Sequence, residues 1–419
     1  MRGVRPVAWS VWLAVLLTAC GAAAAELEAA PDPGDWEAVL AAADGATVDL
    51  HMWGGSTEIN RFVDDTYGPR LAELGITLNR VPLADTADAV NAVLGELEAG
   101  RTAGGSIDLI WINGENFATL RQADALLTGW AEALPTAELV DWDDPAIAFD
   151  AGRPVEGAES PWGSAQFQFV YDTARTDEAD LPRSYAQLRT WIMANPGRFT
   201  YPAPPAFHGT RFLKQWFYEL DGGPGPWVDT FDPDAFDTAV DPLWDVLEEL
   251  RPYLWREGAT YPTDISELDR LFANGEVDLT FTQLPAGIGA NIDAGVLPTT
   301  ARPFVFDTGT IGDSHYLAIP SNAGEPAAAM VFADLVLQPE LQAAKLDPAN
   351  GWGDGIVVSP DRLSGDDRAE IDAIVATLGA FAVDQADLDR VRLPETLGAF
   401  TDRLDRGWDR SIRQRQPRG

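Results

Sequence analysis

Hydrophobic positions divide the first part of the chain into alternating strands and helices. Residues 47–53, 76–81 and 108–112 carry the apolar runs and alternation typical of strands. Between these strands, apolar residues recur at helical spacing after Thr57 and again over residues 86–97. Strands that alternate with helices predict a parallel sheet with helices on its faces.

A strand at residues 166–171 is expected to carry the chain into a second lobe. The elements predicted for that lobe are a strand at 199–201, helices at 208–220 and 236–250, and a strand at 277–282. Residues 304–320 are then expected to return the chain to the first lobe. Three further predicted helices finish the body, at residues 326–341, 368–378 and 394–408.

The N-terminus has the pattern of an export signal. Arg2 and Arg5 precede an apolar run at residues 7–17, which is too short to span a bilayer. The run ends in Leu-Thr-Ala-Cys, which resembles a bacterial lipobox, so Cys20 is expected to carry a lipid. The alternative is an ordinary secretory signal cut among residues 22–25. Cys20 is the only cysteine, which excludes internal disulfides.

The length remaining after the signal exceeds what one core usually organises, so two lobes are expected. The predicted fold is α/β and two-lobed, with a ligand cleft between the lobes at the carboxyl ends of the strands. The predicted segments are a lipoprotein signal peptide (1–20), a tether (21–34), the first part of lobe 1 (35–165), lobe 2 (166–303), and a return to lobe 1 with C-terminal helices (304–419).

Acidic residues dominate the charge of the chain. There are 66 Asp and Glu residues against 29 Lys and Arg, for a formal charge of −37. A chain this acidic repels nucleic-acid phosphates, so nucleic acid is excluded as a partner. Surface carboxylates of this kind keep a protein soluble, and the charge therefore does not identify a ligand.

Three stretches resemble the signature segments of the YnjB-like substrate-binding proteins of ABC transporters, and they lie at residues 53–60, 108–117 and 205–212. The likeness runs along nearly all of the mature chain. It implies the type II periplasmic-binding-protein fold, an extracytoplasmic location, and a permease and an ATPase as partners. We also expect a monomer that binds a small solute, without a cofactor and without catalysis. Relatives in the wider fold bind thiamine, polyamines and iron.

A glycine-containing loop follows the first predicted strand. Trp53 ends the strand, and Gly54, Gly55, Ser56 and Thr57 lead into a helix. Backbone N–H groups and hydroxyls at such a helix start bind polar or anionic ligands. In the alternative reading, Ser56 or Thr57 only caps its own helix.

Polar residues follow the third predicted strand, which ends near Trp111. Asn113, Glu115 and Asn116 occupy the equivalent place there, and their side chains are expected to face the same cleft. The alternative is turn chemistry at the start of a helix.

Two further stretches are expected at the hinge or at the wall of the cleft. Trp162 and Ser164 precede the crossing strand, while His208 and Thr210 open a helix of the second lobe. His208 also fits a local cap or turn. Arg211 is expected to pair with a carboxylate of the protein, because acids outnumber bases more than two to one.

Enzymatic readings find little support in the sequence. Asp313, Ser314 and His315 are adjacent, but neighbours on a strand point to opposite faces and do not form a Ser-His-Asp relay. The aspartates of residues 229–241 lack the glycine and the spacing of a calcium loop, and no metal site is predicted. The alternatives left open are an exported hydrolase or glycan-processing enzyme, and a surface-anchored binding protein without a transport role.

The charge of the ligand is the subject of a separate hypothesis. Each of three tryptophans near predicted strand ends has a glutamate close by in the sequence, namely Trp53 with Glu58, Trp111 with Glu115, and Trp162 with Glu159. Aromatic faces and carboxylates attract cations, so a thiamine-like compound or a polyamine is the hypothetical ligand. The alternative is that these tryptophans are core or rim residues.

Overall fold

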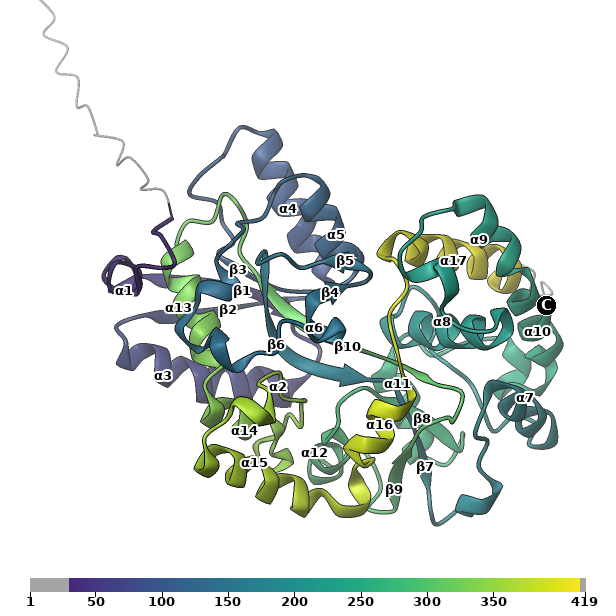
Figure 1. The fold of residues 1–419 in the computed structure, drawn as a ribbon. Coiled ribbons are helices and arrows are strands. Elements are labelled where there is room, and N and C mark those ends of the chain that lie inside the picture. Colours follow the sequence, from purple (N-terminus) through teal and green to yellow (C-terminus); the bar gives the residue numbers. More distant parts are fainter. Residues whose placement is uncertain (1–29, 415–419) are drawn as a thin grey trace, which may run out of the picture.

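The computed structural model describes residues 30–414, which form two α/β lobes joined by strands that pass between them (Figure 1). The predicted signal peptide, Cys20 and most of the tether lie outside the described residues. Within residues 30–414, every helix is too short or too polar to cross a bilayer.

A six-stranded sheet organises the first lobe. Its strands are β1 (Thr47–Trp53), β2 (Thr77–Leu83), β3 (Leu109–Ile112), β6 (Glu159–Gln166), β10 (Thr310–Ala318) and β11 (Arg392–Leu393). β1 runs parallel to β2 and β3, whereas β10 runs antiparallel to β3 and to β6. The carboxyl ends of β1 and β3 therefore lie side by side at one edge, the edge at which ligands bind in such sheets.

Helices cover both faces of this sheet and make a separate core on each. The helices of the first lobe are α1 (Trp36–Ala43), α2 (Thr57–Phe62), α3 (Gly68–Glu73), α4 (Thr86–Glu98), α5 (Glu115–Gln122), α6 (Pro145–Ala148), α13 (Pro326–Val336), α14 (Pro339–Leu346) and α15 (Gly365–Leu378). One core joins Leu50 and Leu317 to α1 and α13, and the other joins Ile110 and Tyr316 to α4 and α5. Alternate side chains of one strand thus enter opposite cores.

The second lobe is built on an antiparallel sheet of β8 (Leu279–Thr282), β7 (Gln168–Asp172) and β9 (Ala301–Phe304). Its helices are α7 (Tyr185–Ala194), α8 (Phe207–Asp221), α9 (Pro233–Ala239), α10 (Asp241–Leu250), α11 (Ile265–Ala273), α12 (Gly287–Asp293) and the C-terminal α17 (Thr401–Trp408). Stacked and edge-to-face rings such as Phe169, Phe212 and Phe281 dominate its core.

Three connections pass between the lobes. β6 ends at Gln166 in the first sheet, and β7 begins at Gln168 in the second. Residues 305–309 lead from β9 back to β10, and α16 (Gln385–Val391) with β11 leads to α17. Trp408 of α17 is buried in the core of the second lobe, where its indole Nε1 donates to Tyr201. The helix α17 therefore packs on the second lobe (Figure 1).

The two-lobed α/β prediction is confirmed, and the strand at residues 47–53 has the predicted limits. The prediction of a strand at residues 199–201 was wrong. These residues form no strand, and the Phe199 carbonyl accepts a hydrogen bond from the Trp255 N–H group. The predicted helices 236–250 and 326–341 are each divided in two, at Val240 and before Pro339. Proline lacks an N–H group and is tolerated only in the first turn of a helix, so it begins a new helix at these positions.

Candidate ligand-binding site

Polar groups in the loop after β1 form hydrogen bonds with neighbouring parts of the first lobe. Gly54 N–H donates to Leu83 O at 2.9 Å, and the Asn60 amide donates to Gly54 O at 2.9 Å. The Ser56 hydroxyl accepts from Ile59 N at 3.3 Å and caps α2, as the alternative reading proposed. Gly55 and Thr57 are exposed beside it. Ligand contact by this loop stays a prediction.

The loop after β3 is held by a buried carboxylate. Gly114 has a φ of +66°, and its N–H donates to both oxygens of Asp150, at 2.8 and 2.7 Å. Burial raises the pKa of Asp150 well above its ordinary value, although the Gly114 N–H group acts against this rise. Asn113 and Asn116 are half-buried on either side, and Glu115 is exposed at the first residue of α5.

Trp111 and Trp162 belong to one aromatic cluster, which also contains Trp352 and His315. The ring of Trp111 lies 5.1 Å from that of Trp162 and 5.0 Å from that of His315. Trp162 is fully buried, and its Nε1 donates to Tyr67 Oη at 3.3 Å. Trp111 is only half-buried and packs against the fully buried Trp162. Trp53, at the end of β1, is also half-buried.

An ion-paired group lies beneath this cluster. Asp354 Oδ2 is 2.9 Å from His315 Nε2 and 2.8 Å from Lys345 Nζ, and Lys345 also donates to Trp162 O at 2.7 Å. Burial alone would raise the pKa of Asp354, but His315 and Lys345 together hold it below its usual value. The pKa of Lys345 lies below its ordinary value, because burial lowers it more than Asp354 raises it.

The start of α8 carries the site residues predicted for the second lobe. Thr210 is buried, and its hydroxyl donates to Asp405 Oδ1 at 2.6 Å. His208 is half-buried, and burial together with the nearby Arg211 lowers its pKa to about 3. His208 is therefore neutral near pH 7. Ser164, on the crossing strand β6, is half-buried opposite Ser314.

Two cations of α8 are already neutralised within the protein. Arg211 donates to Asp313 at 3.0 Å and lies 3.1 Å from Glu395, and Lys214 lies 3.1 Å from the same Glu395. The prediction that Arg211 pairs with a carboxylate of the protein is confirmed. We call Arg211, Lys214, Asp313 and Glu395 the interlobe ion network, because Asp313 belongs to the strand that returns to the first lobe. Its four formal charges cancel.

The structure also separates the residues of the hydrolase reading. His315 pairs with Asp354, whereas Asp313 pairs with Arg211. Among residues 30–414, no group of three or more His, Cys, Asp or Glu side chains is arranged to hold a metal ion.

Sequence reasoning missed Lys345, Asp354 and Glu395, which come together only through the fold. The composition of the chain did contain one signal for the basic members of these ion pairs, Lys214 and Lys345. Lys214 and Lys345 are the only lysines of a chain whose other basic residues are arginines, and both are buried in ion pairs.

The comparisons with known proteins agree with this architecture. A family model described as bacterial extracellular solute-binding protein matches residues 70–354. Protein YnjB of Escherichia coli strain K12 is 43% identical over 338 residues, which cover 80% of this chain and 86% of YnjB. The chain belongs to this family of bacterial extracellular solute-binding proteins. The resemblance to YnjB is thereby confirmed.

Solved structures share the fold at low sequence identity. The spermidine/putrescine ABC transporter substrate-binding protein PotD from Streptococcus pneumoniae has a TM-score of 0.57 and 14% identity, over 88% of this chain and 99% of PotD. The periplasmic binding protein AfuA from Actinobacillus pleuropneumoniae, with fructose-6-phosphate bound, has a TM-score of 0.59 and 13% identity, over 88% and 99% of the two chains. The type II periplasmic-binding-protein fold is thus confirmed for this chain.

Proposed function

We propose that this chain is the substrate-binding component of an ABC importer and that it holds a small solute between its lobes. The supporting observation is the meeting of the two lobes at the strand-end edge. Gly398 of the segment leading to α17 lies against the backbone of Glu115 at the start of α5, and Glu115 interacts electrostatically with Lys214 of α8. A permease and an ATPase are the proposed partners, and the chain acts as a monomer that binds without catalysis.

The proposed ligand-contacting groups lie at the ends of β1 and β3 and in the loops after them, on β6, and at the start of α8. They are Trp53, Gly54, Gly55, Ser56, Thr57, Trp111, Asn113, Glu115, Asn116, Ser164, His208 and Thr210, with Trp162 behind Trp111. Both lobes contribute to this set, so a bound solute stabilises their approach. Closure around a ligand is the usual motion of two-lobed binding proteins.

We further propose that the solute is an organic cation. Arg211 and Lys214 are already paired with Asp313 and Glu395, so the interlobe ion network offers no free positive charge to an anion. Trp111 presents a half-buried aromatic face, and Glu115 adds a carboxylate, whose pKa burial raises and the nearby Lys214 lowers. Both groups favour a cation.

Titration of tryptophan fluorescence tests the proposal. Spermidine or thiamine should change the fluorescence at micromolar concentrations, and the double variant Trp111→Ala with Glu115→Gln should bind at least about tenfold more weakly, since the loss of a cation–π contact and a carboxylate exceeds roughly 1.4 kcal/mol. Glu370→Gln, at an exposed position on α15, is the matched control and should bind like wild type.

The outcomes distinguish the proposed solute-binding role from the proposed cationic class of the ligand. Binding of a sugar, an amino acid or an oxyanion in place of every organic cation would refute the cation class and keep the solute-binding role. If no small solute changes either the fluorescence or the melting temperature of ligand-free protein, the transport role is wrong and a surface-anchored binder of larger partners is favoured.

The chain is also proposed to be anchored outside the cytoplasmic membrane through a lipid on Cys20. Replacement Cys20→Ser removes the thiol that would carry the lipid, so the variant should incorporate no fatty-acid analogue and should leave the membrane fraction or stay unprocessed. Metabolic labelling followed by fractionation measures both effects. Equal labelling of the variant and the wild type, or of neither, would instead support an ordinary secretory signal.

A further inference from the structure

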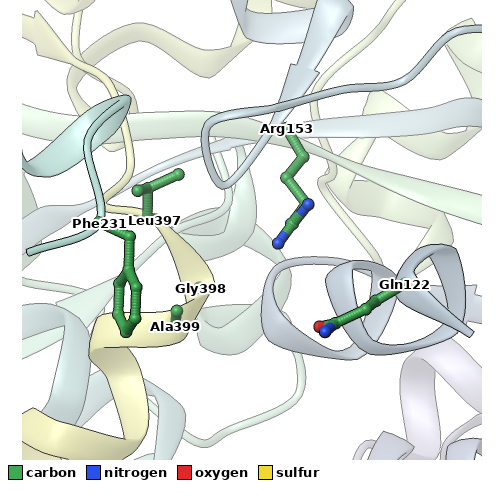
Figure 2. Close-up of a pocket in the computed structure, with 6 residues that line it drawn as sticks. All are labelled: Gln122, Arg153, Phe231, Leu397, Gly398 and Ala399. Atoms are coloured by element: carbon green, nitrogen blue, oxygen red, sulfur yellow. The ribbon is translucent and has the colours of Figure 1, made fainter.

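A cavity of about 250 Å³ lies between the lobes and contains none of the residues proposed above for solute binding. Gln122 at the end of α5 and Arg153 of the hairpin strand β5 (Arg153–Pro154) line it from the first lobe. Phe231, before α9, and residues 397–399 line it from the opposite side (Figure 2). Both lobes thus form its wall.

Two glycines allow the lobes to approach each other next to this cavity. Gly152, at the turn between β4 (Phe149–Asp150) and β5, has a φ of +75°, and a Cβ atom there would lie 2.1 Å from Val228 O. A Cβ atom on Gly398 would lie 2.8 Å from the Cα of Glu115. Only glycine fits such approaches, so the backbone around the cavity is closely defined.

Arg153 is exposed at the hairpin, and its guanidinium group lines the cavity without an ion-pair partner in the described part of the chain. Figure 2 shows its guanidinium group extending toward α5, on the side where Gln122 lies. None of the ion pairs found among residues 30–414 uses this guanidinium, although carboxylates greatly outnumber basic groups in the chain. By contrast, the neighbouring Arg121 lies 3.0 Å from Glu156.

The chemistry of the lining selects one class of ligand. An unpaired guanidinium binds a carboxylate through two parallel N–H bonds, and the Gln122 amide is a further donor. Phe231, Leu397 and Ala399 form an apolar wall opposite these groups. The volume is below the roughly 300–1,000 Å³ of drug-sized sites, so the ligand is a single ring or a short branched chain.

We propose that this cavity is a second binding site, for a small organic carboxylate with an aromatic or branched apolar body. Its ligand contacts both lobes at once, through Arg153 and Gln122 on one side and Phe231 on the other. A ligand that binds only this arrangement of the lobes increases its population. The cavity shares Gly398 with the contact between the lobes, but none of the residues proposed to bind the transported solute lines it.

Calorimetric titration of the full chain with three related probes tests the site. Benzoate should bind with a dissociation constant of about 1 mM or lower. Benzyl alcohol, which lacks the charge, and benzylamine, which reverses it, should bind much more weakly. Arg153→Ala should weaken benzoate binding about tenfold or more, because it removes a charge-assisted hydrogen-bond donor. Arg121→Ala, one residue before Gln122, is the matched control and should leave benzoate binding unchanged.

Two results would overturn the proposal. One is the absence of benzoate binding to wild type, and the other is equal binding by wild type and Arg153→Ala. Spermidine titrations of the same variants keep this result distinct from the transport proposal, since Arg153 is outside the proposed solute site.

Hydrogen exchange tests whether the ligand bridges the lobes. Benzoate should slow amide exchange both in residues 149–154 of the hairpin and in residues 397–400 across the cavity. Phe231→Ala should reduce this protection while keeping the preference for benzoate over benzylamine. Protection confined to the hairpin would refute the bridging part of the proposal.

Discussion

Lys345 shows how one buried cation connects several parts of the first lobe. It is fully buried, and it donates to Asp354, to Trp162 O and to Gly355 O at 2.8, 2.7 and 2.6 Å. These bonds fix the backbone of β6 against the loop that follows α14. Since Trp162 packs behind Trp111, the lysine also positions the aromatic cluster.

Replacement Lys345→Met keeps much of the side-chain volume but leaves Asp354 with His315 as its ion-pair partner. Breaking a buried ion pair by removing one partner costs about 3–5 kcal/mol of unfolding free energy. Urea unfolding should show that loss, with an unchanged m-value.

Arg362→Ala is the matched control, because Arg362 pairs with Asp141 at 3.1 Å on the surface. Exposed pairs contribute about 1 kcal/mol or less, so this control should lose little stability. If Lys345→Met lost no more than Arg362→Ala, the structural role of the lysine would be wrong.

Contacts between elements place other carboxylates in apolar surroundings. Asp269 of α11 faces β8, where its Oδ1 accepts from the Thr280 hydroxyl at 2.6 Å. Burial raises the pKa of Asp269 to about 7, the Thr280 bond acts against this rise, and Asp264 adds to it. In the folded protein the carboxyl group is therefore protonated under mildly acidic conditions.

The raised pKa predicts a pH-dependent contribution to stability. The folded-state pKa of about 7 exceeds an unfolded value of about 3.9, so this contribution is fully present below about pH 4 and is lost as the pH rises toward 7. Asp269→Asn mimics the neutral form and should be more stable than wild type at pH 8, by about 1.4 kcal/mol per unit of pKa difference. The two proteins should be similar at pH 4.

Unfolding by urea at both pH values measures this difference. Asp293→Asn, at an exposed position on α12, is the control and should change stability little at either pH. A constant difference between Asp269→Asn and wild type across the two pH values would contradict the assignment.

At the scale of the whole molecule, the returning segments decide how the lobes meet. α17 follows a segment that places Glu395 against Arg211 and Lys214 and Gly398 against α5. The C-terminal segment therefore forms part of the second lobe and part of the contact between lobes (Figure 1). The lobe boundaries predicted at 165/166 and 303/304 remain proposals. Within the last predicted segment, residues 304–419, the helix α17 packs on the second lobe.

The formal charge of −37 acts on the same scale. Ion pairs neutralise individual carboxylates, such as Asp313 and Asp354, wherever they are buried beside a cation. Buried carboxylates without a cation partner among the described residues, such as Asp150 and Asp269, have raised pKa values, and exposed carboxylates interact with salt and solvent. The net charge does not set the preference of either proposed site, because each depends on the few charges within it.

Local sequence patterns determined the order of the elements in the first lobe. Apolar alternation defines β1 because successive side chains of a strand point to opposite faces, and Ser56 caps α2 because its hydroxyl bonds a nearby backbone N–H group. These effects act within a few residues. The motifs of residues 53–60 and 108–117 also carried the family resemblance.

Only the tertiary structure decided which distant groups meet. Trp162 was predicted as a contact residue, but the fold buries it behind Trp111, and residues 199–201 bond to a loop where a sheet was expected. Asp354 reaches His315 across 39 positions, and Glu395 reaches Arg211 across 184. The spacing of hydrophobic residues along the sequence indicates which face of a helix or strand is apolar. The partner of a buried charge depends on how those elements pack in space.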